Sequence, residues 1–282
     1  MSLLPDGFTF SQGSLQDYVD CPRRFELRYL LQLSWPAVES EPARENERLL
    51  LQGTRFHLLI HQYLLGLSRH QLSTQVQDAD LQRWWDAFLN RFDNDGAFSE
   101  PSTGLFPEAS LTATLAGFRL VAKCDLIRIG LDGRLTIYDW KTSRTLPRRV
   151  WLKERLQTRL YPYLLVRSGT YMSSGNPVTP HQVEMVYWYA DAPDELIRFQ
   201  YSEEQYRTDG DYLTGLISRI QSHGLGEFPL TDKEERCRYC TYRSLCGRGI
   251  EAGALADMDA DFLLKDFFDI EIKPEEISEI EY

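Results

Sequence analysis

The sequence of 282 residues lacks several features that define whole classes of proteins. No apolar run approaches the ~20 residues that a helix needs to cross a bilayer. The first residues lack the basic and then apolar pattern of a secretory signal. A Gly-x-x-x-x-Gly-Lys-Ser/Thr phosphate loop is also missing, so the chain has no obvious helicase or ATPase engine of its own. We therefore expect an intracellular, cytoplasmic protein that has no contact with a membrane.

Positive charge is scarce overall but locally concentrated. The formal net charge is −11, which by itself argues against a nucleic-acid partner. However, residues 251–282 hold 11 Asp or Glu and only two Lys, whereas the stretch Lys141 to Arg159 holds seven Lys or Arg and one acid, Glu154. A basic strip of this density can bind phosphates whatever the total charge is. A solvated helix face is the alternative interpretation of the strip.

Hydrophobic periodicity predicts an α/β protein. Helices are expected from Ser14 to about Leu31, from about Glu45 to Leu65, over 78–92, from about Val150 to Val166, and from Ser202 to about Gln221. Strands are expected at Leu111–Ala116, Phe118–Ile129, Leu135–Thr142, Val183–Tyr189 and Leu196–Tyr201. In the second helix, one predicted face consists of Leu50, Thr54, His57, His61 and Leu64.

The turn at Asp132-Gly133 determines which residues of two neighbouring strands face each other. A two-residue turn would place Leu126 opposite Asp139. A three-residue loop with Gly133 in the left-handed conformation pairs Gly130 with Arg134 and places Asp125 opposite Asp139. We favour the three-residue loop because it matches apolar with apolar residues, and it brings two carboxylates within ~5 Å. Such a pair repels unless a cation lies between its members.

Asp139-Trp140-Lys141 ends one of these strands. Because side chains alternate along a strand, Asp139 and Lys141 point to the same side. Together with Asp125 they form a set that suits phosphodiester hydrolysis. Carboxylates bind Mg²⁺ or Mn²⁺, and the metal ion polarises the phosphate and activates water. A lysine nearby can stabilise charge at the phosphorus.

The order of these motifs resembles that of the RecB-like branch of the PD-(D/E)XK nuclease superfamily. The resemblance consists of Asp125, then Asp139-x-Lys141, then Gln157-x-x-x-Tyr161, with Gly53-Thr54-Arg55-Phe56-His57 upstream. It implies that Asp125, Asp139 and Lys141 are catalytic. It also implies that the metal is held by His57, Asp125, Asp139 and the backbone carbonyl of Trp140. Gln157 and Tyr161 would contact DNA or order the site.

The same resemblance implies a restriction-endonuclease-like fold, with a central mixed sheet flanked by helices. Residues 1–250 would form a single nuclease domain, with a helical lobe at about 45–105, a catalytic core at about 106–225, and a cluster segment at 226–250 together with Cys21. The basic strip adds candidate DNA contacts at Arg144, Arg148, Arg149, Lys153 and Arg159. Glu108 stands where many members have a glutamate before the strands.

Cysteines are few, and four of the five flank the nuclease motifs. Cys21 lies upstream, whereas Cys237, Cys240 and Cys246 cluster downstream. Four thiolates can hold zinc or an iron–sulfur cluster, and spacing alone does not separate the two. The pattern resembles the iron–sulfur nucleases among CRISPR-associated RecB-like proteins, which implies a structural 4Fe-4S cluster, with Zn²⁺ as the alternative. The fifth, Cys124, is predicted to be a buried small apolar residue.

This resemblance implies a metal-dependent DNA nuclease that acts on single-stranded DNA or DNA ends in recombination, repair or CRISPR adaptation. Its partners would be DNA and a helicase or CRISPR adaptation proteins. The alternative is an inactive iron–sulfur or zinc-stapled DNA-binding or adaptor subunit, against which the intact Asp125, Asp139 and Lys141 argue. The acidic tail, 251–282, is expected to be a disordered solubilising segment, a cover for the basic strip, or a docking peptide for a partner.

Overall fold

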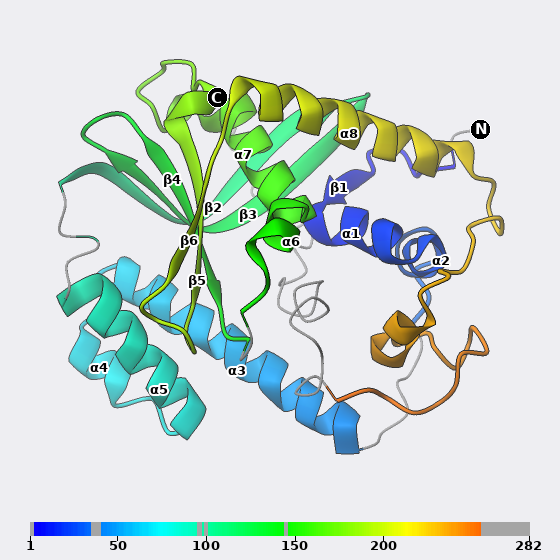
Figure 1. The fold of residues 1–282 in the computed structure, drawn as a ribbon, viewed down its shortest axis with the longest axis horizontal. Coiled ribbons are helices and arrows are strands. Elements are labelled where there is room, and N and C mark those ends of the chain that lie inside the picture. The colour runs from blue at the N-terminus through cyan, green and yellow to red at the C-terminus, as the bar shows by residue number, and fades with distance from the viewer. Residues whose placement is uncertain (1–2, 35–40, 95–97, 99–100, 144–145, 255–282) are drawn as a thin grey trace.

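The computed structural model describes residues 3–34, 41–94, 98, 101–143 and 146–254 (Figure 1). Within them, six strands form one mixed sheet in the order β1-β3-β4-β5-β6, and β2 also pairs with β3. The pairs β1–β3 and β4–β5 are parallel, whereas β2–β3, β3–β4 and β5–β6 are antiparallel. The strands are β1 (Thr9–Ser11), β2 (Ser102–Leu115), β3 (Phe118–Gly130), β4 (Leu135–Lys141), β5 (Val183–Tyr189) and β6 (Leu196–Gln200).

Helices pack on both faces of this sheet. They are α1 (Gln12–Asp20), α2 (Pro22–Phe25), α3 (Glu41–Leu64), α4 (Arg69–Ser73), α5 (Ala79–Phe88), α6 (Arg149–Lys153), α7 (Leu156–Ser168) and α8 (Glu203–Ser222). Two π-helical turns, Glu26–Leu30 and Leu89–Asn94, continue α2 and α5. Short 3₁₀ helices lie at Gly169–Tyr171, Pro180–Gln182 and Glu234–Tyr239.

Two apolar clusters show which helices cover which face. One cluster joins Ile127 and Ile137 of the sheet to Leu15 of α1, Leu160 of α7 and Ile217 of α8. The other joins the opposite face to α3 and α5, and its buried aromatic side chains include Phe56, Trp84, Trp85, Trp140 and Trp188. Figure 1 shows α3, α4 and α5 grouped on one side of the sheet and α8 on the other. A mixed sheet flanked by helices is therefore confirmed. No helix in the described ranges combines the length and hydrophobicity that crossing a membrane would require.

The loop between β3 and β4 confirms the predicted register. The N–H of Gly130 donates to the carbonyl of Arg134 at 2.9 Å, and Gly133 has a φ of 78°, the left-handed conformation that glycine adopts without a steric penalty. Ile129 pairs with Leu135, and Ile127 pairs with Ile137. The described ladder ends at Leu126 and Tyr138. Asp125 therefore lies where the two strands begin to separate.

Several predicted boundaries need correction. The first helix begins at Gln12, because Ser11 is its N-cap and exchanges hydrogen bonds with Ser14. It ends at Cys21, whose extended backbone (φ −160°, ψ 104°) precedes Pro22. The helix expected at 150–166 is two helices, α6 and α7, and α7 continues past Pro162. The buried face of α3 carries Phe56, Leu59 and Ile60, whereas on the predicted face Thr54 is exposed and His57 is partly buried.

Candidate functional site

Asp139 and Lys141 lie near the carboxyl end of β4, which is buried along its whole length. Their side chains are 5% and 9% exposed, and Lys141 Nζ lies 2.9 Å from Asp139 Oδ2. On the neighbouring parallel strand β5, Tyr187 pairs with Asp139 and Tyr189 pairs with Lys141. The alternation of side chains thus places an acid and a base together at one point of the sheet.

Asp125 connects the sheet to the helical lobe. Its Oδ2 accepts the backbone N–H of Trp140 at 2.8 Å, and its Oδ1 lies 3.1 Å from Nδ1 of His57 on α3. Burial by itself would lower the pKa of His57, but the adjacent Asp125 carboxylate raises it overall. Burial by itself would raise the pKa of Asp125, but His57 and the Trp140 N–H lower it. The predicted ligands His57 and Asp125 therefore do meet.

Helix α7 positions the other predicted carboxylate. Gln157 is 2% exposed, and its Nε2 donates a hydrogen bond to Asp139 Oδ1. One residue further, the Thr158 hydroxyl lies 2.7 Å from the Tyr187 hydroxyl, which ties α7 to β5 beneath the site. Tyr161 follows one turn later and is 4% exposed. Gln157 thus orients Asp139, and neither Gln157 nor Tyr161 presents much surface to a ligand.

Glu108 is a further acidic residue near this point. The pairs Pro107–Leu126 and Ala109–Cys124 on either side of it place Glu108 opposite Asp125 in the register of β2 and β3. Its φ of 52° is a left-handed conformation that is unusual for a residue other than glycine. Its carboxylate lies 2.7 Å from Lys123 Nζ. Strain of this kind often accompanies functional sites.

The family model that describes the PD-(D/E)XK nuclease superfamily matches residues 9–247. The chain belongs to this superfamily. PD-(D/E)XK nucleases typically use a divalent metal ion, and their substrates are nucleic acids. The region matched contains both strands of the carboxylate site, together with α3 and α7.

Among the solved structures that match, one with a TM-score above 0.5 has a similar fold. A crystal structure from Eubacterium rectale, described as that of a candidate exonuclease, gives a TM-score of 0.51 at 11% identity, covering 79% of this chain and 84% of that chain. The crystal structure of a protein designated SSO0001 gives a TM-score of 0.38 at 14% identity, covering 86% of each chain. No curated protein matches the sequence.

The basic strip of this PD-(D/E)XK chain contains one arginine bound in buried ion pairs and several basic residues that are exposed. Arg159 pairs with buried Asp209 at 3.0 Å and with Glu154, and so connects α7 to α8. Arg149 is exposed, and its guanidinium stacks on Phe199 with 4.5 Å to the ring centroid. Arg148 and Lys153 are also exposed, and Arg148 lies over the ring of Trp151. Arg144 lies outside the described residues.

Three residues near the site were missed by sequence reasoning. Burial raises the pKa of Tyr189 above its usual value, with Arg155 opposing the rise and Asp139 adding to it. Burial also raises the pKa of Tyr187, which Asp139 raises further and Arg155 lowers. Arg155 is half-buried at the N-cap of α7, two residues before Gln157. Its position two residues before Gln157 was the sequence signal that could have identified Arg155. Tyr187 and Tyr189 could be identified only from the pairing of β5 with β4.

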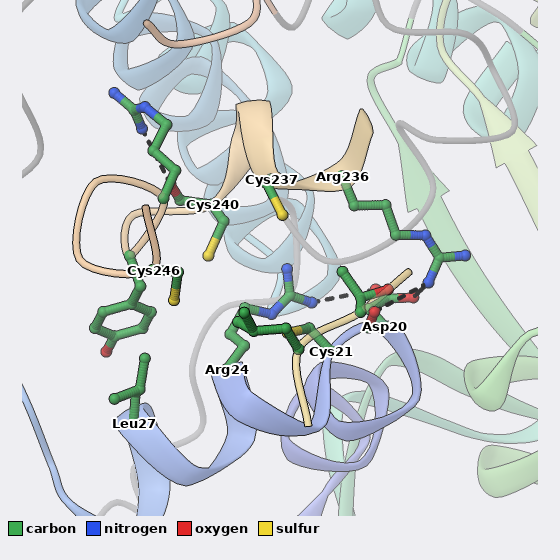
Figure 2. Close-up of a pocket in the computed structure, with 12 residues that line it drawn as sticks. Asp20, Cys21, Arg24, Leu27, Arg236, Cys237, Cys240 and Cys246 are labelled. Carbon is green, nitrogen blue, oxygen red and sulfur yellow. Dashed lines mark hydrogen bonds and ion pairs between the residues drawn. The ribbon is translucent and has the colours of Figure 1, made fainter. Parts of the chain in front are cut away.

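The four predicted ligand cysteines lie together far from the carboxylates in sequence. Cys21, Cys237, Cys240 and Cys246 line a single pocket with Arg24, and Figure 2 shows Cys237, Cys240 and Cys246 directed into a common space. Burial raises the pKa of Cys237 to about 11, and the other three thiols contribute to this rise. Cys124 is fully buried in the core instead, as predicted.

The two sites offer different donor atoms. The first provides carboxylate oxygens and an imidazole, which suit a divalent ion such as Mg²⁺ or Mn²⁺. The second provides thiols, which suit zinc or iron–sulfur chemistry. In the described part of the chain, no three His, Cys, Asp or Glu side chains already have the arrangement that would hold a single metal ion. The donor atoms of each site fit the metal group expected there. The side chains of either site would have to move before they could surround that group.

Proposed function

We propose that this chain is a metal-dependent DNA nuclease that hydrolyses phosphodiester bonds in single-stranded DNA or at DNA ends. The observation that carries the proposal is the meeting of His57, Asp125, Asp139 and Lys141 where β3 and β4 separate. Membership of the PD-(D/E)XK superfamily supports a phosphodiester as the bond that is cut. A lysine buried against Asp139, with Asp125 partly buried beside them, is an arrangement that functional sites favour.

Each residue has a distinct task in this proposal. Asp125, Asp139 and His57 hold the divalent ion, with the carbonyl of Trp140 as a further ligand. The bound ion supplies Lewis acidity toward the phosphate and lowers the pKa of water. Lys141, held against Asp139, stabilises the negative charge that develops on the phosphate oxygens. Gln157 keeps Asp139 in the orientation that the ion requires.

The exposed basic residues of α6 are proposed to hold the DNA backbone. Arg148, Arg149 and Lys153 are exposed just before α7, the helix that carries Gln157. Arg159 is not included, because its guanidinium is bound to Asp209 and Glu154. Phosphate contacts of this kind position DNA without reading its sequence. The RecB-like motif order supports a role in recombination, repair or CRISPR adaptation, beside a helicase or adaptation proteins.

The cysteine pocket is proposed to hold a structural 4Fe-4S cluster. The four thiols border a shared pocket, as ligands to the separate corners of a cluster would. The pocket joins the α1–α2 junction to the 3₁₀ helix Glu234–Tyr239, and Arg236 Nη1 reinforces this junction through Asp20 Oδ1 at 2.7 Å. A cluster here would close a very long loop, where a cross-link removes much chain entropy. Zinc is the alternative occupant.

A cleavage assay tests the nuclease proposal. The full chain is incubated with labelled single- and double-stranded DNA in Mg²⁺ or Mn²⁺, beside Lys141→Ala. We expect wild-type cleavage and a loss of about two orders of magnitude or more in the variant, the scale for removing a charge-stabilising group. Lys233→Ala, at an exposed position, is the control and should cleave normally. A wild-type chain that binds DNA but leaves it intact with every divalent ion would favour the adaptor alternative.

A further inference from the structure

Arg24 occupies an unusual place beside the four cysteines. It lies on α2, three residues after Cys21, and its side chain lines the cysteine pocket. Figure 2 shows it reaching toward the space that the Cys237 and Cys240 side chains enter. Its side chain is only 13% exposed. The pocket therefore contains a largely buried cation next to groups that become anions when they bind a metal.

Two buried carboxylates hold this cation in place. Arg24 Nε lies 2.7 Å from Asp17 Oδ1, and its Nη2 lies 3.1 Å from Asp20 Oδ2. Arg28 also pairs with Asp17, at 2.8 Å, and Arg236 also pairs with Asp20, at 2.7 Å. The five side chains comprise three guanidinium groups and two carboxylates, so the set carries a surplus positive charge. Because its partners fix the guanidinium, Arg24 loses little conformational freedom when an anionic centre forms beside it.

A cluster bound by four thiolates is an anionic centre. In its oxidised state it carries two net negative charges, and one-electron reduction adds a third. We propose that Arg24 is the counter-charge of this centre, and that it raises the midpoint potential by stabilising the reduced state. This inference rests on the iron–sulfur centre of the proposed function. Arg24 is thus a positioning residue that acts on the cluster through its charge.

A purely structural role for Arg24 is the competing explanation. Its ion pairs join α1 to α2, and that task alone could account for them. Arg28 offers a matched control, because it shares Asp17 with Arg24, whereas its side chain is 38% exposed and does not line the pocket. Arg24→Gln and Arg28→Gln each remove one positive charge and one ion pair with Asp17. Arg24→Gln also removes the ion pair with Asp20, so Arg24→Lys, which keeps the charge, is compared with both variants to separate the charge beside the thiols from that contact.

The test is a redox titration of the full chain, purified without oxygen and reconstituted with iron and sulfide. Dithionite supplies the electron, and visible absorption follows the one-electron reduction. In Arg24→Gln we expect the equilibrium constant for reduction to fall about tenfold, which is about 59 mV for a one-electron couple. In Arg28→Gln solvent screening should keep the change below about threefold. Arg24→Lys should stay near the wild type, because it keeps the charge.

The outcomes separate the inference from the proposed function. Equal shifts in Arg24→Gln and Arg28→Gln, or none in either, overturn the counter-charge. If Arg24→Gln does not fold, Arg24→Lys decides, since a tenfold fall there contradicts the proposal. A wild type that binds zinc through the four cysteines overturns the iron–sulfur centre only. In that case Arg24→Gln must lose zinc to a chelator at least about fivefold faster than Arg28→Gln, and equal rates overturn the counter-charge. A wild type that binds no metal there overturns both.

Discussion

The carboxylate site and the cysteine pocket are assembled in opposite ways. Asp125 and Asp139 come from one hairpin, so the local chemistry of a short turn sets their distance. Cys21 and Cys237 come from distant parts of the chain, and tertiary packing alone brings them to one pocket. The comparison teaches that two carboxylates on one hairpin can keep their spacing without a bound ligand, whereas a site built on chain closure depends on its ligand. We therefore expect the two sites to fail separately.

The largest expected effect is at the cysteine pocket. Cys246→Ser should abolish the visible absorption of the cluster and lower the free energy of unfolding by about 4 kcal/mol, the scale for a cross-link that closes a long loop. Urea unfolding measures the change. Cys124→Ala is the control, because Cys124 is buried away from the pocket and its removal should leave the absorption intact. An unfolding free energy that is the same in Cys246→Ser and the wild type would contradict a structural role.

The converse experiment alters the carboxylate site. Asp139→Ala should reduce metal-dependent cleavage by about a hundredfold or more, because it removes a metal ligand and the partner of Lys141. Visible absorption and iron content should not change. If this variant loses iron together with activity, the two sites are not independent and the comparison fails.

A smaller effect is expected where α7 supports the carboxylate site. Gln157→Ala should raise the Mn²⁺ concentration needed for half-maximal cleavage about tenfold, since Gln157 orients Asp139 without binding the ion itself. Gln205→Ala is a matched control, because Gln205 donates to Asp209 in the same way, at 2.8 Å, on α8. Equal Mn²⁺ dependence in both variants would contradict the proposal that Gln157 orients Asp139.

The smallest effect is expected on the exposed surface. Arg148→Ala should weaken DNA binding a few-fold and reduce the slope of log affinity against log salt by about one. Fluorescence anisotropy at several salt concentrations measures this slope. Arg207→Ala removes an equally exposed arginine that pairs with Glu203 on α8, and its slope should equal that of the wild type. A slope in Arg148→Ala that also equals the wild type would exclude a phosphate contact there.

Sequence reasoning was most accurate where local chemistry decides the structure. The Asp132-Gly133 turn has few conformations that suit a hairpin, so the register of β3 and β4 followed from it. β5 spans Val183–Tyr189 as predicted, because β-branched and aromatic residues dominate this short segment. The helix expected from Ser202 is α8, which begins at Glu203 with the Ser202 hydroxyl as its N-cap. The hairpin register in turn predicted that Asp125 lies level with Asp139.

The remaining features depend on tertiary contacts. The three-residue strand β1 is too short for a periodic signal, and its pairing with β3 creates it. Phe56, Leu59 and Ile60 follow helical spacing, but the neighbouring face also carries apolar residues, and the packing of Phe56 on Trp84 and Trp188 decides which face is buried. The sequence also could not show that Arg159 is bound to Asp209, because charge patterning does not identify a partner 50 residues away. Because of this ion pair, Arg159 is not among the residues proposed to contact DNA.

The central claim is that Asp125 and Asp139 bind one divalent ion beside Lys141. The most direct measurement is anomalous diffraction at the manganese edge from crystals of the full chain soaked in Mn²⁺. The account predicts a single strong peak within about 2.5 Å of an oxygen of each aspartate, with His57 adjacent. Manganese bound elsewhere, or a site that stays empty while the soaked protein cleaves DNA, would contradict it.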